Sequence, residues 1–474
     1  MGKYGYLIKN MGLLTLSSFA TKLLSFFLVP MYTSVLTTGE YGTYDLFNTT
    51  ISLLVPLLTF DIQEAVLRFS MDNNTDYNKI WYIGCRYSIL SCLVVFVGLM
   101  LNRISGLIPI LQRYEIEFLV LYSLTAFNGI ILYFFRGNGK ITDLSVAGVI
   151  SSVVMISCNI LFLLVLKIGL YGYFWASILG LAAQCSYLLI KSKIWTNYKY
   201  HKDDIMLRKE MTNYSKPMIA NAISWWVNNA SDRYVVTWMC GVAVNGVYSV
   251  SYKIPSIMSI LQSIFSQAWT LSATKEFDRE DKEGFFINIY NAYNFLLVSA
   301  CSFLIFLDRP LAKILFANEF FSAWKYAPFL MISTIFSGMA AFLGGILSAL
   351  KKSGLFAKSS VITALINTIL NVVLVFLIGP LGAAISTSFA YFIMWIIRLK
   401  QVKQSINLRV DLIRDSMAYL VLVIQTLMLL MISEQIIFCW YQLIFVVIIL
   451  LLYRKEIKSF CIIIFNKIVT TQKN

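Results

Sequence analysis

The residues best suited to chemistry are ionisable side chains set inside long apolar stretches. Asp232 and Arg233 lie in the apolar stretch 214–240, and Lys253 lies in the next one, 245–270. A charged side chain at the centre of a bilayer costs about 2.5–3.5 kcal/mol on insertion scales, so it persists where it faces a partner or a wet cavity. The two stretches are therefore predicted to line a polar passage. A structural ion pair of Asp232 with Arg233 or Lys253 is the alternative.

Polar residues accompany these charges at helical spacing, on one face of each of four apolar stretches. Single Ser, Thr or Asn residues commonly form hydrogen bonds between spans at about 0.6 kcal/mol each, whereas a stripe that includes an ionisable group favours a hydrated face. The stripes comprise Ser18, Lys22 and Ser25; Asp45, Asn48 and Ser52; Asn221, Ser224, Asn228 and Asp232; and Lys253, Ser256 and Gln267. Asn229 and Arg233, four residues apart, lie on the adjoining face of the third stretch.

The elements that must position these side chains are membrane-spanning helices. Of the 474 residues 58% are hydrophobic and 13% are charged, and the mean hydropathy is +0.73, which is far from a soluble globular composition. A span needs about 20 apolar residues, and about fourteen candidates meet that length. They are 11–36, 42–67, 81–101, 116–135, 145–167, 170–190, 214–240, 245–270, 286–307, 326–350, 357–378, 381–399, 415–433 and 435–453.

The distribution of positive charge predicts the orientation. Of the 39 Lys and Arg residues, six fall in the loops on one side, and most of the others fall in the termini and loops on the opposite side. By the positive-inside rule both termini are cytoplasmic. The net charge of +15 therefore reflects topology and anionic lipid, and no nucleic-acid partner is expected.

Neither a cleaved leader, nor a disulfide framework, nor a metal site is expected. The first apolar stretch is span-length and contains Lys22, which argues against a signal peptide. The eight cysteines are scattered without paired spacing. The single histidine, His201, lies in a charged loop without cysteine neighbours, so the sequence predicts neither a metal nor a bound cofactor.

An internal repeat divides the chain. Residues 33–44 match 237–248, which aligns Gly42 with Gly246, and the turns 136–140 and 168–172 match 351–355 and 378–382. An even number of spans separates the copies, so the repeats run parallel. We therefore predict an all-α membrane protein with a six-helix lobe over 1–200, a second over 205–403, and two appended helices with a basic amphipathic cytoplasmic tail over 404–474.

Several short motifs, in order along the chain, resemble the Wzx-type oligosaccharide flippases of the multidrug/oligosaccharidyl-lipid/polysaccharide (MOP) exporter superfamily. They are FDIQEAVLRF (60–69), DRY (232–234), GVYSVSYKIP (246–255), QAW (267–269) and LFANEF (315–320). The resemblance implies a transporter of the bacterial cytoplasmic (inner) membrane. Such a protein moves undecaprenyl-diphosphate-linked oligosaccharide to the periplasmic leaflet for O-antigen, capsule or exopolysaccharide synthesis.

Carried onto this chain, the resemblance implies a role for each class of residue. Lys22, Arg233 and Lys253 would engage the diphosphate, and Asp45, Asp61 and Asp232 would carry the coupling ion of a proton or sodium gradient. The polar stripes and Trp225 could contact sugars, while membrane lipids, a polysaccharide polymerase and chain-length machinery are the implied partners. The sequence contains no GxxxxGK[ST] loop for ATP.

Three alternatives stay open at this point. A lipid-II-type flippase shares the cationic cavity, and a cation-coupled multidrug exporter of the same superfamily would favour acidic and aromatic groups. A membrane enzyme, such as a polymerase or glycosyltransferase, would need a larger outside loop than 308–325, whose only carboxylates are Asp308 and Glu319. No catalytic residues are therefore predicted.

Overall fold

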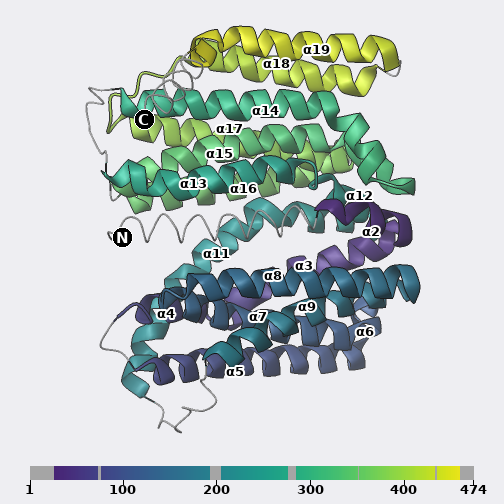
Figure 1. Ribbon diagram of the computed structural model, residues 1–474, viewed down its shortest axis with the longest axis vertical. Coiled ribbons are helices and arrows are strands. Elements are labelled where there is room, and N and C mark those ends of the chain that lie inside the picture. Colours follow the sequence, from purple (N-terminus) through teal and green to yellow (C-terminus); the bar gives the residue numbers. More distant parts are fainter. Residues whose placement is uncertain are drawn as a thin grey trace, which may run out of the picture. The chain divides into compact units, whose positions relative to one another are not determined.

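The computed structural model describes residues 26–72, 76–192, 204–275, 284–350, 352–432 and 435–458, and its regular elements are all helical (Figure 1). The predicted all-α class is confirmed. The chain forms two compact units, residues 1–237 with 241–246, and residues 238–240 with 247–474. The lobe boundaries predicted from the repeat stay a prediction.

The first unit contains a bundle in which α8 and α5 each lie against a more central helix, α9 and α7 respectively, and α4 also contacts α7. Its elements are α2 (Val29–Val35), α3 (Thr38–Leu58), α4 (Ile62–Phe69), α5 (Tyr77–Ser105), α6 (Pro109–Arg113), α7 (Glu115–Gly137), α8 (Ile141–Asn159), the π-helix η1 (Ile160–Val165), α9 (Gly169–Ser192), α11 (Ile205–Cys240) as far as residue 237, and the first turn of α12 (Val242–Ser251).

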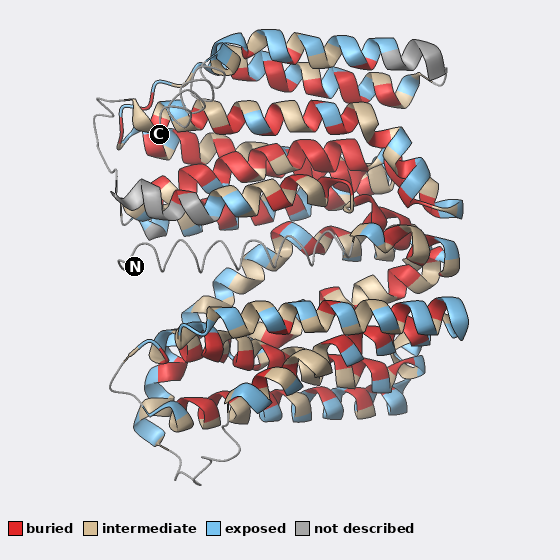
Figure 2. Ribbon diagram, in the orientation of Figure 1, coloured by how far each residue is buried: buried red, intermediate tan, exposed pale blue. Residues whose placement is uncertain are grey.

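The second unit is built around α15 (Ala327–Ala349), which contacts α13, α14 and α17. Within its most apolar 18-residue window 78% of α15 is buried, so Figure 2 shows it largely red. The other elements are the remainder of α12, α13 (Pro255–Lys275), α14 (Phe285–Leu315), the 3₁₀-helix η2 (Asn318–Lys325), α16 (Ser353–Ile378), α17 (Pro380–Lys403), α18 (Leu412–Met431) and α19 (Gln435–Leu452).

Within the described residues nine helices are long and apolar enough to cross a membrane, and the bent pair α3 and α4 makes up to ten. The multi-pass character follows directly. The predicted total of fourteen spans stays a prediction. Part of 11–36 and residues 433–434 lie outside the described ranges, and α11 and α13, which cover most of the predicted spans 214–240 and 245–270, are not among the nine helices.

Two predicted spans are interrupted. The prediction of one continuous helix over 42–67 is wrong, because α3 and α4 meet at a bend of 62°. Pro56 in the last turn of α3 has no N–H to donate, and Phe60 and Asp61 both adopt positive φ, at 55° and 48°. The predicted helix over 245–270 is likewise interrupted at 252–254, and α13 restarts at Pro255, a residue well suited to a first helical position.

The start of α3 and the start of α12 touch backbone to backbone within the first unit. A Cβ atom on Gly42 would lie 2.1 Å from the Val242 carbonyl oxygen, and one on Gly246 would lie 1.9 Å from the Thr38 carbonyl oxygen. Each glycine thus contacts the residue four positions before the other. The repeat aligns Gly42 with Gly246 and Thr38 with Val242, so the contact is symmetric in the repeat.

Hydrogen bonds between buried polar side chains connect α18 and α19 to α14. Gln425 donates to Gln442 Oε1 (2.9 Å), and Ser302 of α14 donates to Gln425 Oε1 (2.8 Å). All three side chains are at most 1% exposed. The two appended helices are therefore joined to the second unit by side-chain hydrogen bonds as well as by apolar packing.

The helix α11 begins at Ile205, nine residues before the predicted start, because Asp204 caps it. The Asp204 carboxylate accepts from the Leu207 N–H at 3.1 Å and pairs with Lys79 at 3.0 Å. These interactions, with the Leu207 hydrogen bond the largest, lower the pKa of Asp204. Met211, one turn further on, joins the apolar cluster of α4, α5 and α7.

Removal of this cap provides a pH-dependent test. A depressed carboxyl pKa contributes stability above the unfolded-state pKa, near 4, and that contribution is lost as the pH falls through the folded-state value. We expect Asp204→Asn to lower the unfolding temperature at pH 7 and to converge on the wild type in acid. Thermal unfolding of both proteins from pH 7 to pH 3 measures this, and a difference that grows in acid would contradict it.

Candidate polar site on α3 and α11

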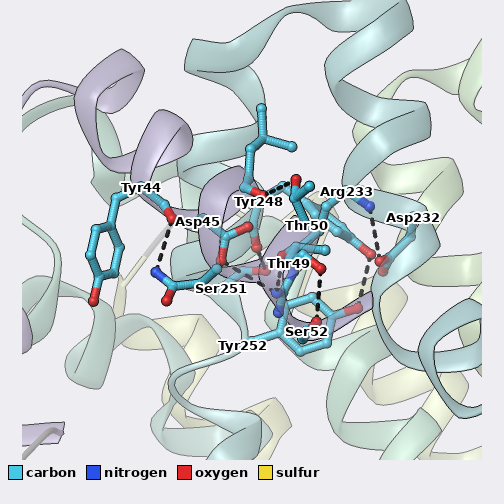
Figure 3. Close-up of polar contacts among 12 residues, drawn as sticks. Tyr44, Asp45, Thr49, Thr50, Ser52, Asp232, Arg233, Tyr248, Ser251 and Tyr252 are labelled. Carbon is cyan, nitrogen blue, oxygen red and sulfur yellow. Dashed lines mark hydrogen bonds and ion pairs between the residues drawn. The ribbon is translucent and has the colours of Figure 1, made fainter. Parts of the chain in front are cut away.

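A polar seam joins α3 and α11 inside the first unit. The guanidinium of Arg233 on α11 lies 3.3 Å from the Asp45 carboxylate of α3, measured from Nη1 to Oδ1. The same Nη1 donates to the Thr49 hydroxyl at 3.1 Å. Asp45 and Thr49 are four residues apart and so share one face of α3. Figure 3 shows both side chains directed toward Arg233.

Neighbouring aromatic side chains reinforce the seam. Trp226 Nε1 donates to the Thr49 carbonyl oxygen at 2.9 Å, and the Tyr234 hydroxyl hydrogen-bonds to the Thr50 hydroxyl. The Trp226 and Tyr234 rings lie 5.4 Å apart. The helix α11 is therefore held to α3 by long polar and aromatic side chains on the face that carries Arg233.

The ion pair lies between full burial and full exposure. The Asp45 side chain is 15% exposed and the Arg233 side chain is 21% exposed. At such depth an ion pair is screened less than on a free surface. Removing one partner would leave the other charge poorly solvated.

Asp232 is 3% exposed, and its Oδ1 accepts from the Arg233 backbone N–H at 2.9 Å. This hydrogen bond involves the backbone of Arg233. The guanidinium of Arg233 has Asp45 as a counter-ion, at 3.3 Å. The sequence placed Asp45 and Arg233 on separate spans without predicting that they pair.

The other predicted polar residues of α11 divide between two faces. Asn221, Trp225 and Asn229 are exposed, and Trp225 retains 52% of its surface. Asn228 is buried, and its amide donates to the Ser224 carbonyl at 2.8 Å. An exposed indole between two exposed amides, at four-residue spacing, can offer a stacking surface flanked by hydrogen-bonding groups.

The predicted residues of α3 and the following break also belong to the first unit. Asn48 is half-buried and donates to the Tyr44 carbonyl, whereas Ser52 is exposed and donates to the Thr49 carbonyl. Asp61 lies at the bend before α4, is 5% exposed and accepts from Gln63 Nε2 at 3.1 Å. Asp45 and Arg233 thus meet on the seam, whereas Asp61 lies at the other end of α3.

The predicted residues of 245–270 belong to the second unit. Lys253 is half-buried in the turn between α12 and α13, and its carbonyl accepts from the Ser256 hydroxyl at 2.6 Å. Gln267 is part of α13, but its side chain is not among the described ones. Ser18, Lys22 and Ser25 lie outside the described residues.

The sequence reading missed Thr49, Thr50 and Tyr234. Thr49 lies four residues after Asp45 and therefore on the face of the predicted stripe, so its spacing could have indicated it. Thr50 lies off that face, and α-helical threonines commonly bond their own backbone. Tyr234 stands inside the DRY motif, which was the available signal. Among the residues that the structure describes, no cluster of three His, Cys, Asp or Glu side chains could hold a metal ion.

The fold is similar to that of solved membrane transporters. A lipid II flippase, MurJ, in an inward closed conformation superposes with a TM-score of 0.69 at 15% identity, covering 95% of this chain and 99% of that one. An inward-facing multidrug MATE transporter of the MOP superfamily superposes with a TM-score of 0.63 at 13% identity, covering 81% and 95%.

The chain belongs to the family described as polysaccharide biosynthesis proteins, which matches residues 7–270. It is similar to a probable low-salt glycan biosynthesis flippase, Agl15, of Haloferax volcanii, at 23% identity over 46% of each chain. The alignment therefore spans less than half of that relative. An uncharacterised membrane protein of Methanocaldococcus jannaschii is 23% identical over 76% of each chain. The family membership predicted from the motifs is confirmed.

Proposed function

We propose that this protein is a flippase that moves a lipid-linked oligosaccharide across the cytoplasmic membrane by alternating access. The observation that carries the proposal is the position of the Arg233 cation on a polar seam. The chain that holds it has many apolar helices and belongs to the polysaccharide biosynthesis family. A diphosphate that enters a low-dielectric region needs cations and hydrogen-bond donors. Arg233 and Lys253 are the described residues proposed to supply them, with Lys22 as a third.

The substrate proposed from the sequence is undecaprenyl-diphosphate-linked oligosaccharide, moved from the cytoplasmic to the periplasmic leaflet. The exposed Asn221, Trp225 and Asn229 would contact sugars. An indole face can stack on the apolar face of a pyranose ring, and amides can hydrogen-bond to its hydroxyl groups. An ion gradient would drive turnover through Asp45, Asp61 or Asp232. Both termini would be cytoplasmic, and a polymerase with its chain-length machinery would consume the product.

Arg233→Ala and Lys253→Ala are each expected to abolish glycan export while the protein still inserts. Loss of either cation removes one of the counter-charges of the diphosphate during transit, and breaking a buried charge pair costs about 3 kcal/mol or more, equivalent to at least about a hundredfold in rate. Lys209→Ala, an exposed cation on the same helix α11, is the matched control. Export at wild-type level by both site variants would refute the assignment.

Mass analysis of lipid-linked intermediates after gene deletion separates the possible substrates. Accumulation of diphosphate-linked oligosaccharide on the cytoplasmic face supports the proposal. Accumulation of a peptidoglycan precursor would indicate a lipid-II-type flippase. An unchanged lipid-linked pool with altered drug resistance would indicate a multidrug exporter.

A further inference from the structure

The Arg233 guanidinium already has a counter-ion in this structure. Asp45 lies 3.3 Å from Nη1, and the Thr49 hydroxyl accepts from the same nitrogen. An incoming phosphate must therefore compete with a carboxylate that α3 holds in place. The inference drawn from this competition rests on the proposed function, in which Arg233 binds a diphosphate.

We propose that Asp45 acts as a competing anion within the protein, which keeps singly charged phospholipid head groups from occupying Arg233. The chemistry of the two ligand classes supports this division. A diphosphate diester carries two negative charges and several unesterified oxygens, whereas the phosphodiester of a bulk phospholipid carries one charge and two such oxygens. Both can approach a guanidinium, but the diphosphate binds it more strongly.

Competition with Asp45 lowers the affinity of Arg233 for every anionic ligand by the same factor. The apparent dissociation constant equals the intrinsic one divided by the fraction of protein in which Arg233 is released from Asp45. A strongly bound diphosphate tolerates this penalty and still occupies the site. A weakly bound phosphodiester then occupies only a small fraction of the sites, even though bulk phospholipid vastly outnumbers the substrate in the membrane.

The size of the penalty follows from the depth of the pair. Exposed ion pairs contribute little to stability, but this pair is more buried, at 15% and 21% exposure. A penalty on the order of tenfold in affinity, equivalent to about 1.4 kcal/mol, is therefore expected. Asp45→Asn removes the negative charge while it keeps the size and a hydrogen-bonding oxygen, so it isolates the competition from the packing.

The test measures pyrophosphate binding to the full-length protein by calorimetry, in vesicles of phosphatidylcholine and in vesicles containing increasing phosphatidylglycerol. Asp45→Asn should bind pyrophosphate about tenfold more tightly than the wild type in phosphatidylcholine, and should lose this gain as phosphatidylglycerol is added. The wild type and Asp45→Glu, which keeps the charge, should be nearly insensitive to phosphatidylglycerol. Asp45→Ser repeats the test in case the asparagine variant does not fold.

Two outcomes separate the failures. Equal or weaker pyrophosphate binding by both uncharged variants would overturn the role of Asp45, as would phosphatidylglycerol sensitivity in the wild type. If Arg233→Ala binds pyrophosphate as the wild type does, the proposed diphosphate site itself fails.

Discussion

Alanine at Gly42 or at Gly246 is expected to destabilise the protein severely and to abolish its export activity. The added methyl carbon would lie 2.1 Å from the Val242 carbonyl oxygen in the first case and 1.9 Å from the Thr38 carbonyl oxygen in the second. Both obstacles are backbone atoms of helices, so no side-chain rotation can relieve the overlap. The start of α3 and the start of α12 must separate.

We expect each alanine variant to lose about 3 kcal/mol in the free energy of unfolding, at the upper end of the range for overpacking substitutions. Thermal unfolding of the purified variants and export assays in cells measure the two consequences. Gly39→Ala is the matched control, because Gly39 lies on the same helix α3 and a Cβ there meets nothing within 4 Å. Wild-type stability in Gly42→Ala would mean that the backbones do not approach this closely.

The symmetry of this contact makes a further comparison possible. Since the repeat aligns Gly42 with Gly246, the two single variants should be similarly impaired, and the double variant should be little worse than either one. Once one methyl group has separated the backbones, the second occupies space already opened. Additive losses would indicate that each glycine is needed for a different reason.

The repeat shows how far the sequence could predict this fold. Apolar stretches of span length indicated the helices, and the alignment of Gly42 with Gly246 singled out two residues that prove to touch. The breaks at 59–61 and 252–254 were not predicted, because a proline near a helix end is compatible with both a bend and a continuous span. Whether the chain bends or continues as one helix at these prolines depends on tertiary packing.

The site was predictable in composition but not in pairing. Spacing along α11 placed Arg233 and the polar stripe on known faces, since helical geometry fixes them. The partner of Arg233 lies almost two hundred residues away on α3, and no local pattern indicates that separation. Likewise, single polar residues in apolar stretches, such as Gln425 and Gln442, gave no sign that they pair with each other.

Arg414→Ala is expected to loosen α18 and the segment after α19 from the second unit. The Arg414 guanidinium bonds Asp415 and Asn291, at 2.9 and 2.8 Å, and also pairs with Glu456. Asp415 is fully buried and also accepts from the Tyr453 hydroxyl at 3.2 Å. Removing the cation leaves two carboxylates in a low-dielectric setting without their main counter-charge.

Breaking a buried ion pair from one side typically costs about 3–5 kcal/mol, and we expect Arg414→Ala to fall in that range by denaturant unfolding. Arg414→Lys should recover part of the loss, since an ammonium restores the charge without the planar fork. Arg454→Ala, an exposed cation beside Tyr453, is the control and should unfold as the wild type does.

A double variant distinguishes a charge effect from lost packing. If the loss in Arg414→Ala arises from the stranded charge of Asp415, then adding Asp415→Asn should restore stability, because no unpaired charge remains at that position. If the loss arises from the guanidinium stacked 4.7 Å from the Tyr453 ring, the double variant should be no more stable than the single one. The first outcome would identify this network as an electrostatic attachment of the appended helices.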